Sequence, residues 1–195
     1  MSEEQGANME FRLTYRGQLK SNGTAEQKQR IRRFIHPQLS MLWTQPPLTD
    51  YKEHLPGGKY AAADSPFARA VGPFTFQPLV TSAYDVVAEL DITFLRPEPP
   101  GLLVSNSGDI DNRVKTLLDA LRMPQNLQEL PSNDSPTEHE NPFCVLLEDD
   151  SLITHLAITT DRLLEPTNHQ LDVILIIHVR VKVTRATIDN LSLGV

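Results

Sequence analysis

Two acidic clusters and one lysine are the residues best suited to chemistry in this chain. Asp109 and Asp111 flank Ile110, and a second pair, Asp149 and Asp150, follows about forty residues later. Carboxylate oxygens from a few residues are the ligands that Mg²⁺ prefers, and the ion keeps most of its own waters. If the two clusters meet, they could hold a metal ion that activates a water and stabilises charge on a phosphoryl oxygen.

Lys115 lies four residues after Asp111, which places the two side chains on one face of a helix. Its ammonium group could stabilise charge that develops on a scissile phosphate. Each of these residues also has a purely structural explanation. Asp109 could cap a helix, Asp111 could favour the positive end of the helix dipole, and Asp149–Asp150 could form a turn. Taken one at a time, the residues leave both explanations open.

The elements that must position these residues follow from hydrophobic spacing. An amphipathic helix is predicted from Asp109 onward, because apolar residues recur at helical spacing over 110–121. Alternating apolar residues predict strands over 11–16, 86–94 and 171–183. A further strand is expected over 74–81.

Two less regular regions complete the pattern. A helix is predicted after Thr24, an N-cap residue, and Pro37 should end it near His36 or kink it. Residues 145–159 are typical of a hairpin or a bent strand, interrupted by the Asp149–Asp150 pair. The predicted order is β-α-β-β-α-β-β. This order lacks regular βαβ alternation and favours one compact α+β (mixed α/β) domain over residues 1–195.

Two segments lengthen this domain. Residues 44–73 are rich in proline and glycine and are predicted to be a surface insertion. Residues 122–144 are polar and acidic and are predicted to be a flexible loop.

The string from Gly108 to Leu121, GDIDNRVKTLLDAL, resembles the RusA-type Holliday-junction resolvases. The signature of that family is similar to Asp-x-Asp-Asn-x-x-Lys-x-x-x-Asp-Ala-Leu, followed later by an Asp-Asp pair near a strand. Residues 147–151 supply the second part. The element order extends the resemblance over most of the chain and implies a RusA-like fold.

The resemblance also implies an activity and a set of site residues. Such proteins are homodimeric, Mg²⁺-dependent endonucleases of DNA recombination and repair, which place symmetric nicks in four-way junctions; Mn²⁺ is expected to substitute. The catalytic aspartates of the family fall on Asp109, Asp111 and Asp150, and its important lysine falls on Lys115. Asp149 is a further candidate metal ligand. No small-molecule cofactor is expected beside the metal.

The overall charge argues against a general polyanion-binding protein, since 25 acidic and 18 basic residues give a formal net charge of −7. Basic residues nevertheless gather near the N-terminus. Four of them are candidate contacts to DNA phosphates: Lys20, Arg30, Arg32 and Arg33. A solvated helix face explains the same residues about equally well.

Alternative functions differ in how well they suit the sequence. An EF-hand fails because Val114 and Ala120 stand where glycine and glutamate are required. An Asp-x-Asp phosphatase would need an apolar strand leading directly into Asp109, and the polar residues 105–108 intervene. The remaining alternative is a catalytically inactive RusA-like homodimer that binds DNA or protein. The negative charge and the long insertions favour it.

Composition also predicts where the protein acts. Cys144 is the only cysteine, which excludes an intrachain disulfide and a cysteine-based zinc site. No apolar run is long enough to span a bilayer, and the acidic start lacks a signal-peptide pattern. We therefore expect a cytoplasmic protein without a membrane partner.

Overall fold

Seven strands form two mixed sheets, and two α-helices pack with them, in the part of the chain that the structure describes. The structure is a computed structural model that describes residues 9–54, 68–99, 110–187, 190 and 193. The α+β fold class predicted from the sequence is confirmed. None of the helices in these residues is long and apolar enough to cross a membrane.

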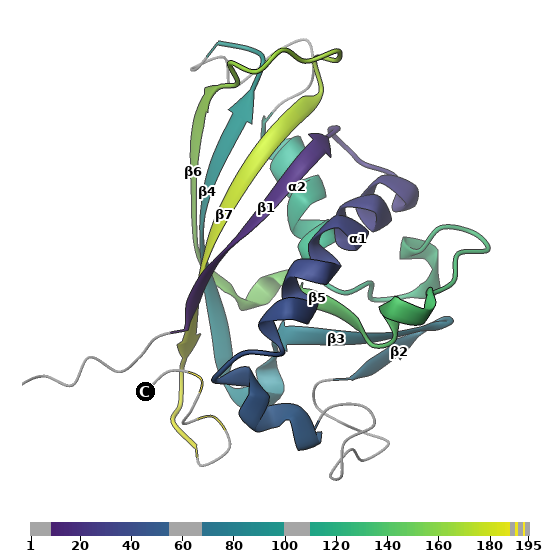
Figure 1. Cartoon of the computed structure of the whole chain (residues 1–195), viewed down its shortest axis with the longest axis vertical. Helices are drawn as coiled ribbons and strands as arrows, with labels where there is room; N and C mark the ends of the chain where they lie inside the picture. Colours follow the sequence, from purple (N-terminus) through teal and green to yellow (C-terminus); the bar gives the residue numbers. More distant parts are fainter. Residues whose placement is uncertain (1–8, 55–67, 100–109, 188–189, 191–192, 194–195) are drawn as a thin grey trace, which may run out of the picture.

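The larger sheet has four strands in the order β1-β7-β4-β6 (Figure 1). They are β1 (Glu10–Gln18), β7 (Asp172–Val183), β4 (Val86–Arg96) and β6 (Ile153–Arg162). The pairs β1/β7 and β7/β4 are antiparallel, whereas β4 and β6 run parallel. Strands β1 and β6 are therefore the two edges of this sheet.

The smaller sheet has the order β2-β3-β5, formed by β2 (Arg69–Val71), β3 (Phe74–Val80) and β5 (Phe143–Leu147). A single turn of 3₁₀ helix, Asp150–Leu152, separates β5 from β6. The chain thus changes sheets at this point, and the hairpin or bent strand predicted over 145–159 is wrong. The predicted element order accordingly lacked β2 and counted β5 and β6 as one strand.

Helices α1 (Ala25–Leu42) and α2 (Ile110–Leu121) cover one face of the larger sheet (Figure 1). α2 has the predicted bounds to within one residue. α1 continues past Pro37, so the predicted end near His36 is wrong. Pro37 has no backbone N–H and so cannot donate the usual hydrogen bond within the helix. Burial of Leu39 in the core, two residues later, offsets this loss.

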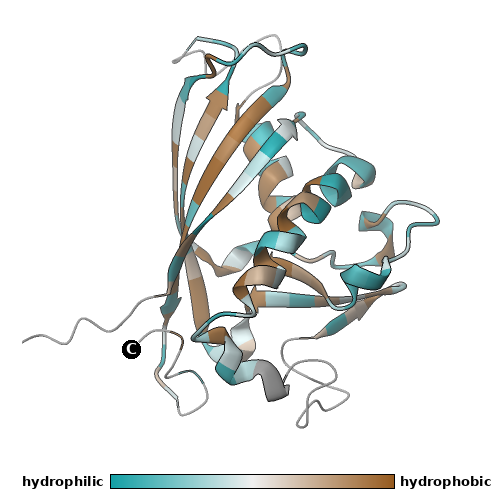
Figure 2. Ribbon diagram, in the orientation of Figure 1, coloured by the Kyte–Doolittle hydropathy of each residue, from teal (hydrophilic) through white to brown (hydrophobic). Residues whose placement is uncertain are grey.

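The core lies between this helical layer and the larger sheet. Alternate residues of β4 and β7 are buried over most of both strands, as predicted from their sequence alternation. Figure 2 shows hydrophobic residues concentrated along these two central strands and hydrophilic residues in the loops. α2 adds Leu117 and Leu121 to the same core.

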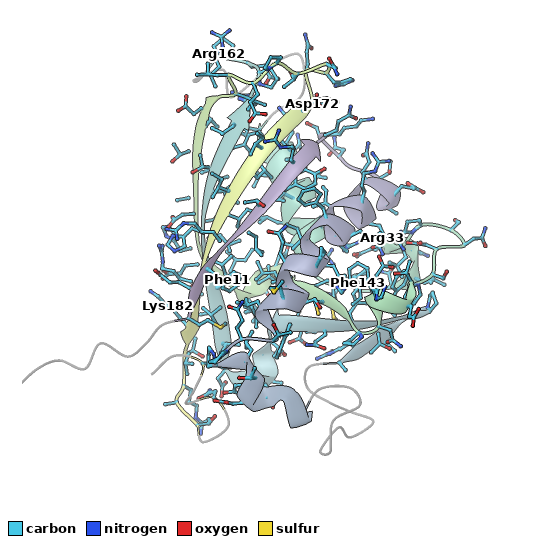
Figure 3. The ribbon with its side chains drawn as sticks, viewed as in Figure 1. Phe11, Arg33, Phe143, Arg162, Asp172 and Lys182 are labelled. Atoms are coloured by element: carbon cyan, nitrogen blue, oxygen red, sulfur yellow. The ribbon has the colours of Figure 1, made fainter. Side chains whose placement is uncertain are left out.

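The two predicted irregular segments contact the core. In the 44–73 insertion, a 3₁₀ helix (Leu48–His54) buries Leu48 and Tyr51, so this part is not a surface excursion. Residues 55–67 of the insertion lie outside the described residues. The acidic loop over 122–144 is anchored by Arg33 of α1, whose side chain Figure 3 labels, through ion pairs to Asp134 and Glu140 at 2.9 Å each. The flexibility of that loop stays a prediction.

Candidate active site

The start of α2 presents two of the predicted site residues to solvent. Asp111 and Lys115 are both exposed and lie one helical turn apart, so they share a helix face as predicted. An Asp111 carboxylate oxygen accepts a hydrogen bond from the backbone N–H of Asn112 at 2.8 Å. Asp109 lies outside the described residues.

Arg113 fixes the start of α2 against the rest of the fold. Its Nε donates to the backbone carbonyl of Leu19 at 2.9 Å, and its guanidinium carbon lies 5.1 Å from the centre of the Phe94 ring. Glu98, just beyond β4, is 3.6 Å from an Arg113 nitrogen. Burial lowers the pKa of Arg113, and the negative charge of Glu98 opposes this shift. The start of α2 therefore lies at the end of β4, and Lys20 follows Leu19 at the same place.

Asp149 and Asp150 lie at the other end of α2. The backbone N–H of Met123, two residues after the helix, donates to the carbonyl of Leu147 at 2.9 Å. Gln125 donates to an Asp149 carboxylate oxygen at 3.3 Å. That carboxylate also caps the 3₁₀ turn by accepting from the backbone N–H of Ser151 at 3.0 Å, and hydrogen bonds from Ser151 lower the pKa of Asp149. Asp150 is exposed.

Glu148 holds the chain in place immediately before this pair. Its carboxylate is buried and accepts from the Thr81 hydroxyl at 2.6 Å and from the Ser82 backbone N–H at 2.9 Å. The Ser82 hydroxyl at 3.0 Å and Arg69 complete its partners. Burial alone would raise the pKa of Glu148, but these hydrogen bonds and the Arg69 charge outweigh burial and hold the pKa below its usual value.

Asp111 does not meet the Asp149–Asp150 pair within one chain. From Asp111 to Arg122, the eleven helical steps cover about 16 Å along the helix axis, and the Asp149–Asp150 pair adjoins the Arg122 end. In the described residues, no group of three or more His, Cys, Asp or Glu side chains could hold a metal ion. The expected convergence of Asp111 with Asp149 and Asp150 is therefore wrong for a single chain. Within the described residues of one chain, the acidic side chains do not come together in a group that could hold the Mg²⁺ ion implied by the resemblance.

The predicted phosphate contacts divide into two pairs. Lys20 and Arg30 are exposed, and neither forms an ion pair with another residue that the structure describes. Arg32, in contrast, is 1% exposed and donates to the carbonyls of Asp119 and Arg122 at the end of α2, so its prediction as a DNA contact is wrong. The Arg33 guanidinium is paired with Asp134 and Glu140 of the acidic loop.

Sequence reasoning missed the residues that support the site, namely Arg113, Gln125 and Glu148. For Arg113 a signal existed: it lies four residues before Leu117, on the face of the helix that the apolar residues occupy. A charge on that face indicates a buried, partnered side chain. Nothing comparable distinguishes Gln125 or Glu148 from other polar loop residues.

Comparison of the chain with protein-family models, with curated proteins and with solved structures finds no match in any of the three.

Proposed function

We propose that this protein is a structure-specific endonuclease that cuts branched DNA, preferably four-way junctions, and depends on Mg²⁺. The observation that carries the proposal is the exposed start of α2, where Asp111 and Lys115 share one helix face and Asp109 adjoins in sequence. A carboxylate and an ammonium group placed side by side on an exposed surface suit work on a phosphodiester. Lys115 would stabilise the charge that develops on the phosphate.

The proposal requires a homodimer, because Asp150 lies at the opposite end of α2. A two-fold axis can bring the start of α2 from one copy to the Asp149–Asp150 pair of the other, and symmetry then creates two equal sites. Two equal sites suit symmetric nicks in a four-way junction. The second copy would thus supply what one chain lacks.

DNA would be held through its phosphates. Lys20 adjoins the start of α2, and Arg30 is exposed on α1. Affinity should fall as the salt concentration rises, because each neutralised phosphate releases counterions, and the slope should be shallow because few such contacts exist. Phosphate contacts of this kind position the protein without reading base sequence.

The test uses a labelled synthetic four-way junction and a linear duplex, each with Mg²⁺ or with chelator. We expect paired, Mg²⁺-dependent nicks in the junction only. Asp111→Asn should abolish nicking, whereas Glu138→Gln, the same acid-to-amide change at an exposed position, should leave it intact. Full cleavage by purified Asp111→Asn would contradict the assignment of the site.

A second candidate is a catalytically inactive homodimer on the same fold that binds DNA or protein. The separation of Asp111 from Asp150 within the chain and the acidic net charge favour it. Tight binding to the junction without nicks in any divalent metal would support this candidate over the endonuclease.

A further inference from the structure

A cavity lies between the end of α1 and the smaller sheet. It has a volume of about 310 Å³, at the lower end of the range found for small-molecule sites. Ser40 of the last helical turn, with Trp43 and Thr44 just beyond the helix, forms part of its wall. Gln77 of β3 and Cys144 of β5 form another part. These two residues are partners in the parallel β3/β5 pairing, so their side chains lie side by side on one face of the sheet.

His36 holds α1 against this sheet. Nδ1 of its buried ring accepts a hydrogen bond from the backbone N–H of Cys144 at 2.9 Å. Because Nδ1 is the acceptor, Nε2 carries the proton and donates to the carbonyl of His139 at 2.9 Å. The ring centre also lies 4.8 Å from that of Phe143, which Figure 3 labels. Contacts within the fold therefore keep the cavity walls in place, as in most preformed ligand sites.

The cavity is remote from the start of α2. α1 has 18 residues, which corresponds to about 27 Å along its axis. The turn before α1 contacts α2, because the N–H of Gly23 donates to the Thr116 hydroxyl at 2.9 Å. The cavity lies at the opposite end of α1 (Figure 1). A ligand bound there would lie far from Asp111 and Lys115.

Gln77 supplies the observation that points to a ligand. It is only 1% exposed, and its side-chain oxygen has no hydrogen-bond partner among the described residues. Buried polar atoms of proteins are nearly always paired, because an unpaired one loses its hydrogen bonds to water without replacement. An N–H group of a ligand in the cavity would supply the missing donor.

The other polar groups around the cavity favour an uncharged ligand. The Thr44 hydroxyl donates to the Met41 carbonyl at 2.6 Å, so its oxygen is left as an acceptor. Burial raises the pKa of Cys144 to about 12, and a hydrogen bond with Ser40 opposes this shift only in part, so the thiol is uncharged at neutral pH. No Asp, Glu, Lys or Arg of the described chain lines the cavity. A charged ligand would lose its hydration there without gaining an opposite charge.

Trp43 adds an aromatic surface to the wall. It is the only tryptophan of the chain and is 6% exposed. Aromatic rings pack favourably on an indole in offset or edge-to-face arrangements. A small heteroaromatic molecule could therefore contact Trp43 and present a ring N–H to Gln77.

We propose that this cavity binds an uncharged, planar heteroaromatic molecule of one or two fused rings, through a ring N–H that donates to the Gln77 side-chain oxygen. The volume of the cavity limits the size of the ligand, and the lack of charged groups in the wall limits its charge. The unpaired acceptor selects a ligand that carries a donor. This site is additional to the proposed endonuclease site and does not depend on it.

The test titrates benzimidazole into the full chain at pH 8, where this probe is uncharged, and follows the indole N–H signal of Trp43 by NMR. Because the chain has a single tryptophan, this signal reports on the cavity wall alone. We expect a saturable shift. The matched probe is 1-methylbenzimidazole, which has the same ring system but a methyl group in place of the N–H hydrogen. It should bind about tenfold more weakly, because Gln77 would again lack a donor.

Two substitutions locate the effect. Gln77→Met removes the acceptor and retains the length of the side chain, so both probes should bind this variant equally. Gln128→Met, the same change at an exposed position, should keep the tenfold difference. Ser40→Leu places a larger apolar side chain at the cavity and should weaken both probes alike. The comparison of the two probes on wild type decides the matter even if Gln77→Met does not fold.

The outcomes are independent of nuclease activity. The absence of a saturable shift with benzimidazole would overturn the proposal, and so would equal binding of both probes to wild type or a tenfold difference that persists in folded Gln77→Met. A protein that nicks junctions and does not bind benzimidazole counts against the cavity alone. A protein that binds benzimidazole as expected and never nicks DNA counts against the endonuclease alone.

Discussion

Glu148 offers the sharpest test of how the Asp149–Asp150 pair is held. The variant Glu148→Gln keeps the shape of the side chain and removes its charge. In the native protein one carboxylate oxygen accepts three hydrogen bonds, from the hydroxyls of Thr81 and Ser82 and from the Ser82 backbone N–H. The other oxygen pairs with Arg69. An amide keeps one acceptor and turns an N–H₂ donor toward the arginine.

The expected loss of stability follows from these contacts. A hydrogen bond to a charged group contributes about 1.5–3 kcal/mol, and a neutral one roughly half of that. Weakening three such bonds in a site that is only 8% exposed should cost about 2–3 kcal/mol. Arg69 adds little, because half of its side chain is exposed to solvent.

The assay is urea unfolding, with the free energy of unfolding compared at pH 7 and pH 3. The folded-state pKa of Glu148 is lowered, so its contribution is present above the unfolded pKa, about 4.3, and is lost as the pH falls through the folded pKa. The difference between wild type and Glu148→Gln should therefore be largest at pH 7 and shrink at pH 3. Glu165→Gln, which breaks an exposed ion pair with Arg16, should cost much less than Glu148→Gln, because solvent screens exposed charges. Equal small losses for both variants, or a Glu148→Gln loss that does not change with pH, would refute the reasoning.

Three further predictions concern the support of α2 and the lone cysteine. Arg32→Met leaves carbonyls at the end of α2 without their donor, and should lower the free energy of urea unfolding by about 2–3 kcal/mol; a loss below about 0.5 kcal/mol would contradict this role. Gly23→Ala places a Cβ 2.4 Å from the Thr116 methyl and should cost about 1–3 kcal/mol in thermal or urea unfolding, with partial recovery when Thr116→Ser removes that methyl. Burial raises the pKa of Cys144 to about 12, so iodoacetamide at pH 8 should label the protein only in denaturant; fast labelling of the native protein would disagree.

Much of the fold follows from periodicity. The alternation in β4 and β7 and the helical spacing of α2 predicted these elements because each buries one face against the same core. Periodicity does not show which strands pair with each other. The short apolar run of β5 has no alternation to assign it to a sheet, so its separation from β6 could not be predicted.

The site was only partly predictable for a related reason. Helical spacing correctly placed Asp111 and Lys115 on one exposed face, since that is a local property of α2. The position of Asp150 depends on where β5 ends, and this is set by tertiary contacts such as those of Glu148. Arg32 illustrates the same limit. A basic side chain in the sequence can equally be a contact to phosphate or a buried anchor, and the tertiary contacts make Arg32 a buried anchor.

The central claim is that the start of α2 from one copy and the Asp149–Asp150 pair of another form the site together. The most direct measurement co-expresses Asp111→Asn and Asp150→Asn chains and assays the mixture on a labelled four-way junction. Half of the dimers are then mixed, and each mixed dimer retains one of its two sites, so we predict about a quarter of wild-type nicking from two variants that are each inactive alone. A silent mixture, beside an active wild type, would contradict the account.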